Sequence, residues 1–300
     1  MLMQLLFWLG KIFAPAVLLG FCLFAAPAMA AATPVIKLGI FPNLSMRLLL
    51  ETYRPLAEAI GKMASVQVEL HSAPDFRTFH QRTLAGEYDL VITAPHLAWL
   101  AWKRAGYRPL LAYDRPVQGI IVVRKDSHIK KLADLKGRKR IATADELAIV
   151  VLRMERSLER VGLKEDQDFI CIDARTHNNA ALQLYEGKVD AAIIGALPYR
   201  KLPEHVRKGL RVISESEPMP SQIYLAGNHI EPTTEARMLT AVHAYMVSPE
   251  GKRFLEAGGF GGVHRLTRTE LNRVADDARR VERLLNVPAT AADKRELTTK

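Results

Sequence analysis

The stretch THNNAALQLYEGKVDAAIIG, residues 176–195, decides the fold that we expect for this chain. Its first half is rich in good helix formers, and Asn178 or Asn179 can cap the helix. Gly187 can take the left-handed conformation that ends a helix. Residues 189–194 then form the apolar, partly β-branched run that is typical of a strand buried on both faces. The stretch therefore predicts a helix, a glycine turn and a buried strand.

The same pattern occurs earlier in the chain, in residues 74–96 (PDFRTFHQRTLAGEYDLVITAPH). In both copies an aspartate follows the glycine after two intervening residues: Asp89 follows Gly86, and Asp190 follows Gly187. Each aspartate stands at the start of a strand, so we expect turn or capping roles and not a catalytic pair. Two copies of one α/β unit predict two similar lobes with a cleft between them.

Strand-like and helix-like segments alternate along the rest of the chain, which predicts mostly parallel sheets with ligand sites at the carboxyl ends of the strands. Residues 118–124 (QGIIVVR) and 221–226 (SQIYLA) each place a polar residue before a β-prone run. We expect them to be the two chain crossings between the lobes. The expected division is a first lobe of residues 34–117 and 227–290, a second lobe of residues 118–226, and a polar tail of residues 291–300.

The first 30 residues differ from the rest of the chain. Lys11 is their only charged residue, and Ala28-Met29-Ala30 is an A-x-A cleavage pattern. This composition is typical of a secretory signal peptide, here residues 1–30 with cleavage after Ala30. Because the apolar stretch is nearly continuous from residue 5 to residue 26, the alternative is an uncleaved segment that anchors the protein in a membrane.

The chain carries a formal net charge of +10, which can indicate nucleic acid or an anionic membrane surface as a partner. Export makes nucleic acid an unexpected partner, and the densest basic run, residues 136–140 (KGRKR), is expected to be a solvated turn. Cleavage of the signal peptide would leave Cys171 as the single thiol, without a disulfide partner. Its apolar surroundings indicate a buried strand residue and not a nucleophile.

The sequence contains no H-E-x-x-H metal motif, no P-loop and no G-x-S-x-G nucleophile motif. Its nine histidines are scattered without the spacing of metal ligands. We therefore expect no enzyme, no cofactor and no bound metal.

Four segments together carry a family resemblance. They are LGIFPN (residues 38–43), LAGEYDLVITAP (84–95), QGIIVVRKDSHIKKLADLKGRKRIAT (118–143) and the opening stretch. In this order they resemble the periplasmic substrate-binding proteins of phosphate, phosphite and phosphonate ABC importers. The resemblance implies a two-lobed type II periplasmic binding fold of class α/β, with two mostly parallel sheets joined by a two-segment hinge, which closes over a small ligand. It also implies an inner-membrane ABC permease as partner, and we expect a monomer.

The resemblance implies an anion site of hydroxyls and backbone N–H groups in a Ser/Thr-rich turn, at the start of the helix that follows the first strand of the second lobe. Here that turn is Ala142-Thr143-Ala144-Asp145-Glu146, in which Thr143 is the only hydroxyl. The two carboxylates would repel a phosphonate, so we expect phosphate itself to bind poorly. The alternative role of Asp145 is that of an ordinary helix N-cap.

The resemblance also places a ligand-contacting histidine at His177, which could instead cap the following helix. Arg175 could clamp an anionic group with two hydrogen bonds, or could be a surface arginine. Asn43, Thr93 and His96 follow strands of the first lobe, where a capping or structural role is the alternative for Asn43 and His96. The expected ligand-binding residues are Asn43, Thr93, His96, Thr143, Ala144, Asp145, Arg175, His177, Asn178 and Ser221.

Three functions remain open on the sequence. The first is the periplasmic solute-binding component of an ABC importer, which captures a small anionic ligand, phosphonate-like or other. The alternative is a ligand-sensing module that presents its closed form to a membrane receptor kinase. An enzyme built on the same fold is the third, and the lack of a nucleophile–base arrangement counts against it.

Overall fold

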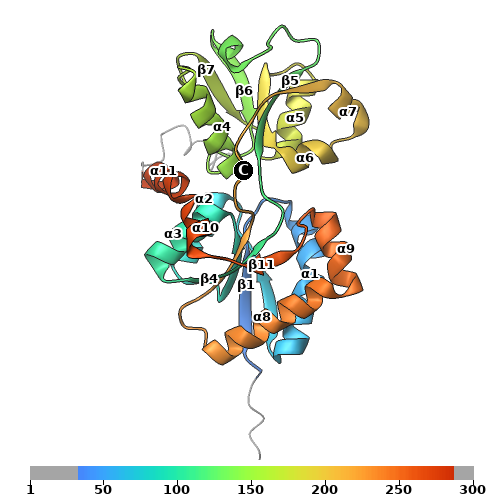
Figure 1. Cartoon of the computed structure of the whole chain (residues 1–300), viewed down its shortest axis with the longest axis vertical. Coiled ribbons are helices and arrows are strands. Elements are labelled where there is room, and N and C mark those ends of the chain that lie inside the picture. Colours follow the sequence, from blue (N-terminus) through green and yellow to red (C-terminus); the bar gives the residue numbers. More distant parts are fainter. Residues whose placement is uncertain (1–32, 287–300) are drawn as a thin grey trace, which may run out of the picture. The chain divides into compact units, whose positions relative to one another are not determined.

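The computed structural model describes residues 33–286, and Figure 1 shows how their helices and strands are arranged. The expected signal peptide, its cleavage site and the expected polar tail lie outside the described residues. Within residues 33–286, no helix is both long enough and apolar enough to span a membrane. Two mixed β-sheets with helices packed against them make up this part of the chain.

The first sheet has six strands in the order β11-β4-β10-β3-β1-β2. β1 pairs in parallel with β2 and β3, whereas β10 runs antiparallel to β3 and β4. The strands are β1 (Val35–Ile40), β2 (Gln67–His71), β3 (Leu90–Thr93), β4 (Arg108–Tyr113), β10 (Ile223–Ala226) and β11 (Val263–Arg265). The helices that accompany them are α1 (Met46–Ala64), α2 (Phe76–Leu84), α3 (Pro95–Ala105), α8 (Pro232–Val247), α9 (Pro249–Gly258), α10 (Arg268–Asn272) and α11 (Ala275–Asn286).

The second sheet has five strands in the order β7-β6-β8-β5-β9. β6 pairs in parallel with β7 and β8, whereas β5 runs antiparallel to β8 and β9. Its strands are β5 (Gly119–Arg124), β6 (Lys139–Thr143), β7 (Phe169–Asp173), β8 (Ala191–Gly195) and β9 (Leu210–Glu215). The helical segments are the 3-10 turn η1 (Leu132–Leu135) and α4 (Ile149–Arg160), α5 (His177–Tyr185), α6 (Ala196–Lys201) and α7 (Glu204–Lys208).

Helices cover both faces of the first sheet, which explains why the sequence of β3 is continuously apolar. Leu90 and Ile92 join the apolar cluster that α1 and α8 complete, whereas Val91 between them joins the cluster that contains residues of α3. Successive side chains of a strand point to opposite faces, so both faces of β3 are buried. Each sheet therefore leaves the ends of its strands as the places where polar groups can gather.

The repeated helix–glycine–aspartate unit has the same local structure in both sheets. Gly86 and Gly187 have φ angles of 75° and 73°, so both take the left-handed conformation that the sequence predicts. The carboxylate of Asp89 accepts a hydrogen bond from the backbone N–H of Lys37, at 2.7 Å, and that of Asp190 accepts one from Arg140, at 2.8 Å. Each aspartate thus fastens the start of its strand to the neighbouring strand, and the predicted turn role is confirmed.

The chain passes between the sheets twice, in residues 114–118 and 216–222. The two crossings touch, because Val117 and Met219 exchange two backbone hydrogen bonds of 2.9 Å. The sequence boundary at residue 226 placed β10 with the second lobe, but β10 pairs with β3 and β4 of the first sheet. The β-prone runs after Gln118 and Ser221 are therefore not the crossings themselves but the strands β5 and β10, which begin beyond them. Within the first sheet β1, β2, β3 and β4 run in the same direction, and within the second sheet so do β6, β7, β8 and β9, as the sequence predicted. The remaining strands, β10 and β11 in the first sheet and β5 in the second, run in the opposite direction, so both sheets are mixed.

His264 of β11 connects Asp114, the residue that follows β4, with Glu270 of α10. Its Nδ1 atom lies 2.7 Å from a carboxylate oxygen of Asp114, and its Nε2 atom lies 3.1 Å from one of Glu270. Partial burial lowers the pKa of His264, but the hydrogen bonds and charges of the two carboxylates outweigh it and raise the pKa above its ordinary value of 6.5. The protonated ring therefore holds β4, β11 and α10 together.

We expect the stabilising contribution of His264 to disappear as the pH rises. Its pKa is higher in the folded than in the unfolded chain, so the contribution is complete below pH 6.5 and is lost as the pH passes through the raised value. The measurement is the free energy of unfolding of the protein and of its His264→Gln variant, at about pH 6 and about pH 9. The difference between the two proteins should shrink at the higher pH, and an unchanged difference would contradict the assignment.

Candidate functional site

Polar side chains lie where strands of the first sheet end. Thr93 is the last residue of β3 and is 1% exposed, and its Oγ1 atom has no hydrogen-bond partner. Asn43 follows β1, the parallel neighbour of β3, and its Oδ1 atom is also buried without a partner. Ser221 is buried two residues before Ile223, which pairs with Thr93. The structure thus brings three of the expected ligand residues to adjacent strand ends.

His96 lies in the first turn of α3 and is completely buried. Its Nε2 atom donates a hydrogen bond to the backbone carbonyl oxygen of Leu147, at 2.8 Å. Because a carbonyl oxygen only accepts, Nε2 carries the hydrogen, and the unpartnered Nδ1 atom of the neutral ring is left with a lone pair. Burial lowers the pKa of His96 to about 3, so the ring is neutral at pH 7. The Nδ1 atom of His96 can therefore accept a hydrogen bond. Its Nε2 atom links the first lobe to Leu147 of the second lobe.

The turn that follows β6 is built differently from the sequence prediction. Thr143 and Ala144 are buried, and the carboxylate of Asp145 accepts a hydrogen bond from the backbone N–H of Leu147, at 2.7 Å. The N-cap of α4 is Ala148, so the interpretation of Asp145 as the N-cap is wrong. Asp145 instead closes the turn ahead of the helix, and burial raises its pKa to about 6.

His177 is the first residue of α5, and Thr176 is the N-cap of that helix. The hydroxyl oxygen of Thr176 accepts the backbone N–H of Asn179, at 3.1 Å, so the predictions that His177, Asn178 or Asn179 caps the helix are wrong. The Nδ1 atom of His177 is buried without a partner, and burial lowers the pKa of the ring to about 4. His177 therefore has no capping role, and its imidazole is neutral.

His177 also lies close to the end of β8. A Cβ atom built on Gly195, the last residue of β8, would lie 3.8 Å from the Nε2 atom of His177. At the ends of β6 and β7, the backbone N–H of Ala174 donates to the carbonyl oxygen of Thr143, at 2.8 Å. The carboxyl ends of β6, β7 and β8 therefore meet around His177 and Thr143, as the parallel strand order predicts.

Two expected residues stand apart from this buried group. Arg175 is exposed and has a φ of 65°, and its backbone N–H donates to Asp173. Asn178 is exposed on α5. No contact among the described residues joins either side chain to the buried group, so the clamp by Arg175 stays a prediction.

The sequence did not reveal the contacts between the two lobes at this site. The carbonyl oxygen of Leu147 accepts a hydrogen bond from His96, and Glu146 forms an ion pair of 2.9 Å with Arg77 of α2. The partners lie 51 and 69 residues apart in the chain, and neither pair forms a recognisable motif. Only the folded structure brings them together.

Unpartnered polar atoms mark the site. Six buried side-chain nitrogen or oxygen atoms of residues 33–286 have no hydrogen-bond partner. Four of them belong to the expected ligand residues Asn43, Thr93, His96 and His177. Buried polar groups in folded proteins are nearly always hydrogen-bonded, so this concentration of exceptions at strand ends makes the four residues the candidate ligand site.

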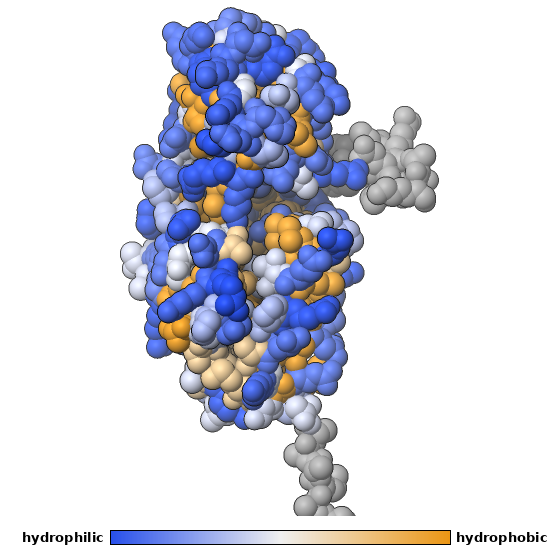
Figure 2. All heavy atoms as spheres, turned by 90° about the vertical axis from the view of Figure 1, so that its right-hand side faces the viewer, coloured by the Kyte–Doolittle hydropathy of each residue, from blue (hydrophilic) through white to orange (hydrophobic). Residues whose placement is uncertain are grey.

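Two surface cavities lie away from these residues. One, of about 490 Å³, is lined by residues of α3, β4, α8 and β11, among them Trp102 and Arg265. Another, of about 540 Å³, lies over α1 and β2. Neither contains an expected ligand residue. Figure 2 shows a mostly hydrophilic face that is hollowed across its middle, with apolar residues beside the hollow.

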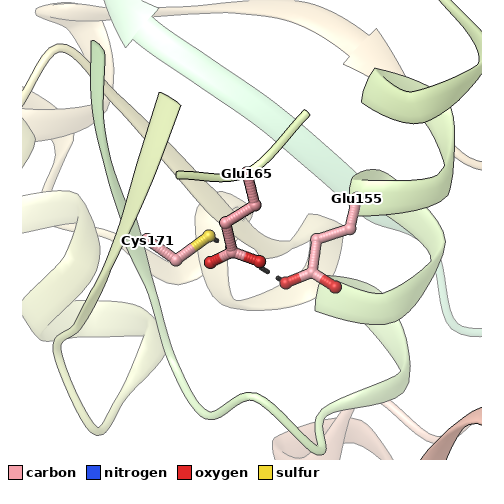
Figure 3. Close-up of side chains that lie close together, drawn as sticks. All are labelled: Glu155, Glu165 and Cys171. Atoms are coloured by element: carbon pink, nitrogen blue, oxygen red, sulfur yellow. Dashed lines mark hydrogen bonds between the residues drawn. The ribbon is translucent and has the colours of Figure 1, made fainter. Parts of the chain in front are cut away.

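A cluster of three potential metal ligands lies outside the site (Figure 3). The ligand atoms of Glu155, Glu165 and Cys171 lie within 4.8 Å of one another. Burial raises the pKa of Glu155 to about 7, and burial together with both carboxylates raises the pKa of the Cys171 thiol strongly. Arg280 also binds a carboxylate oxygen of Glu155. A protonated thiol and a carboxylate held by arginine are poor ligands, so we assign no metal to this cluster.

Comparisons with solved structures place the fold. A binding-protein component of a phosphonate ABC transporter from Pseudomonas aeruginosa is 18% identical, with a TM-score of 0.74 over 88% of this chain and 93% of the other. PhnD1 from Prochlorococcus marinus, in complex with methylphosphonate, is 14% identical, with a TM-score of 0.72 over 83% and 98%. A histidine kinase sensor domain similar to periplasmic binding proteins is 17% identical, with a TM-score of 0.51 over 78% and 99%. These likenesses confirm the two-lobed type II fold.

None of the curated proteins matches the chain. The family model described as "ABC transporter, phosphonate, periplasmic substrate-binding protein" matches residues 38–271, which is more than half of the chain. The match covers both sheets and every buried unpartnered residue of the site, and it confirms the resemblance seen in the sequence. The chain therefore belongs to the family of periplasmic substrate-binding proteins of phosphonate ABC transporters.

Proposed function

We propose that this chain binds a small oxyanion of the phosphonate class between its two lobes and delivers it to an ABC permease, without catalysing a reaction. The observation that carries the proposal is the set of buried, unpartnered polar atoms on Asn43, Thr93, His96 and His177. They come from strand ends of both sheets, which is where a ligand held between two lobes would contact each of them. The complex of PhnD1 with methylphosphonate supports the ligand class.

The chemistry of the site narrows the ligand further. Its buried members are a hydroxyl, an amide and two neutral imidazoles, and Asp145 adds a carboxylate whose pKa is about 6. A fully charged dianion would meet that carboxylate without a compensating buried cation from these residues. We therefore propose a ligand that carries one negative charge, or a negative and a positive group together. Near neutral pH phosphate is a mixture of monoanion and dianion, and its dianion is expected to bind weakly because it would meet the Asp145 carboxylate.

The proposed lobes follow the sheets. The first lobe comprises the first sheet with α1–α3 and α8–α11, the second comprises the second sheet with α4–α7, and the crossings at residues 114–118 and 216–222 form the hinge. The hydrogen bonds between Val117 and Met219 join the two crossings to each other and not to either sheet. The lobes can therefore move apart about these crossings and admit the ligand.

The route to the site of action is also part of the proposal. We propose that the chain is exported with a signal peptide cleaved after Ala30, acts in the periplasm as a monomer, and docks on an inner-membrane permease. The family match favours this importer role over presentation to a receptor kinase. A chain that needs only to close around its ligand and release it has no requirement for a nucleophile, a base or a cofactor.

The test is a binding screen with the purified protein. Thermal unfolding and calorimetric titration would be run with methylphosphonate, phosphite, phosphate, methanesulfonate and acetate. A true ligand at about 100 times its dissociation constant should stabilise the folded protein by about 2.7 kcal/mol. We expect methylphosphonate to give such a shift and phosphate a smaller one, and both shifts to grow as the pH falls from about 8 to about 6, because the monoanion is the proposed ligand. The proposed ligand class is wrong if acetate alone stabilises the protein, or if phosphate binds as tightly as the phosphonate.

A further inference from the structure

The last helix, α11, lies between α3 of the first lobe and α4 of the second (Figure 1). On the α3 side, the guanidinium of Arg104 donates to both carboxylate oxygens of Glu282, at 2.6 and 3.0 Å. The indole N–H of Trp99 donates to Asn272 of α10, at 3.0 Å. These contacts attach α10 and α11 to the first lobe.

On the opposite side, α11 forms ion pairs with α4. Arg153 donates from Nε to the carboxylate of Asp277, at 2.8 Å. Arg280 of α11 donates to Glu155 at 3.1 Å and to Glu159 at 2.9 Å. The pairing is reciprocal, because each helix supplies both acids and arginines. Such an arrangement fits only one register of the two helices.

The centre of the contact between α11 and α4 excludes water, whereas Glu159 at its edge is half exposed. Asp277 is 0% exposed and Glu155 is 8% exposed. One apolar cluster contains Val150 and Met154 of α4 together with Ala278 and Val281 of α11. A carboxylate buried in this way is tolerated only while its arginine is present, because an unpaired buried charge is strongly unfavourable.

Two more contacts join the lobes on this side of the molecule. They are the hydrogen bond from His96 of α3 to Leu147 and the ion pair between Arg77 of α2 and Glu146. Arg77 also donates to the carbonyl oxygen of Leu285, at the end of α11. The helix is therefore the centre of a larger contact between the first lobe and the segment from β6 to α4.

We infer that α11 is a latch, which belongs to the first lobe and holds the second lobe in the position seen in this structure through the ion pairs with α4. The inference rests on the two-lobed closure of the proposed function. Any hinge motion that separates α4 from the first lobe must break the pairs of Asp277 and Arg280 and must expose the apolar residues behind them. Since a buried ion pair adds little net stability but requires correct geometry, the latch selects one arrangement of the two lobes.

The test uses the ligand-free protein, so it does not depend on which ligand the site takes. Asp277→Asn and Arg280→Gln remove the pairs with α4 with little change in shape. Glu282→Gln is the matched control, because it removes a pair of the same helix with α3 inside the first lobe. Circular dichroism first establishes that each variant is folded.

Small-angle scattering should then give a larger radius of gyration for Asp277→Asn and Arg280→Gln, and an unchanged radius for Glu282→Gln. Amide hydrogen exchange in α4 should accelerate about fivefold or more in the first two variants and stay the same in the control. Unchanged radius and exchange in both folded variants would overturn the latch, as would an equal change in the control. Failure of all ligands in the binding screen, with these shifts present, would overturn the proposed ligand and leave the latch intact.

Discussion

Replacing Tyr113 by alanine is expected to lower the free energy of unfolding by about 3–5 kcal/mol, the usual range for a buried aromatic residue. Tyr113 ends β4 immediately before the first crossing and is 1% exposed. Its ring stacks on Phe260 with the centroids 4.0 Å apart, and its hydroxyl lies 2.6 Å from that of Tyr224. Truncation would leave a large cavity and a buried tyrosine hydroxyl without its partner.

Urea unfolding followed by circular dichroism measures this effect. Tyr113→Phe keeps the stacked ring and removes only the hydroxyl, so about 1 kcal/mol is expected. Tyr185→Ala is the control for the loss of an aromatic side chain from the surface, because Tyr185 is 41% exposed. A loss below about 1 kcal/mol for Tyr113→Ala would show that this aromatic cluster does not anchor the end of β4.

The second large effect concerns His177. We expect His177→Ala to weaken binding of methylphosphonate at least tenfold, about 1.4 kcal/mol or more. The imidazole is neutral, since burial lowers its pKa to about 4, and its Nδ1 atom has no partner in the protein. The variant would therefore remove a hydrogen bond to the ligand and little else, because Thr176 and not His177 caps α5.

Isothermal titration of the protein and the variant measures the change. His205→Ala on α7 is the matched control, since His205 is exposed and packs only edge-on against Tyr185. Its affinity should equal that of the unaltered protein. Equal affinity in His177→Ala would exclude His177 from the ligand site. Thr93 and His96 of the first sheet would then remain as the candidate ligand-binding residues.

Much of the candidate site follows from strand order. Thr93 and Thr143 are the last residues of buried strands and His177 is the first residue of α5, and parallel strands bring such positions to one edge of a sheet. The same reasoning assigned Asp89 and Asp190 to turns. These are local relations between neighbours in the sequence, so periodicity and glycine positions are enough to find them.

The predictions of helix caps were wrong where several neighbouring residues could each cap the same helix. Thr176, Asn178 and Asn179 can all cap a helix, and the sequence does not say at which of them the helix begins. Asp145 is a good N-cap residue, yet α4 starts at Ile149. The residues between them form a turn in which the carbonyl oxygen of Leu147 accepts a hydrogen bond from His96 of the other lobe. A tertiary contact thus overrides the local preference.

The amino-acid sequence by itself determined two α/β lobes, their repeated helix–glycine–strand unit and the strand ends where polar residues gather. It could do so because hydrophobic periodicity and glycine conformation act over a few residues. Only the tertiary structure decided that β10 joins the first sheet and that Asp277 and Arg280 of α11 meet α4. The partners in these contacts lie more than 100 residues apart, and their pairing depends on which surfaces the packed sheets bring together, which no local pattern encodes.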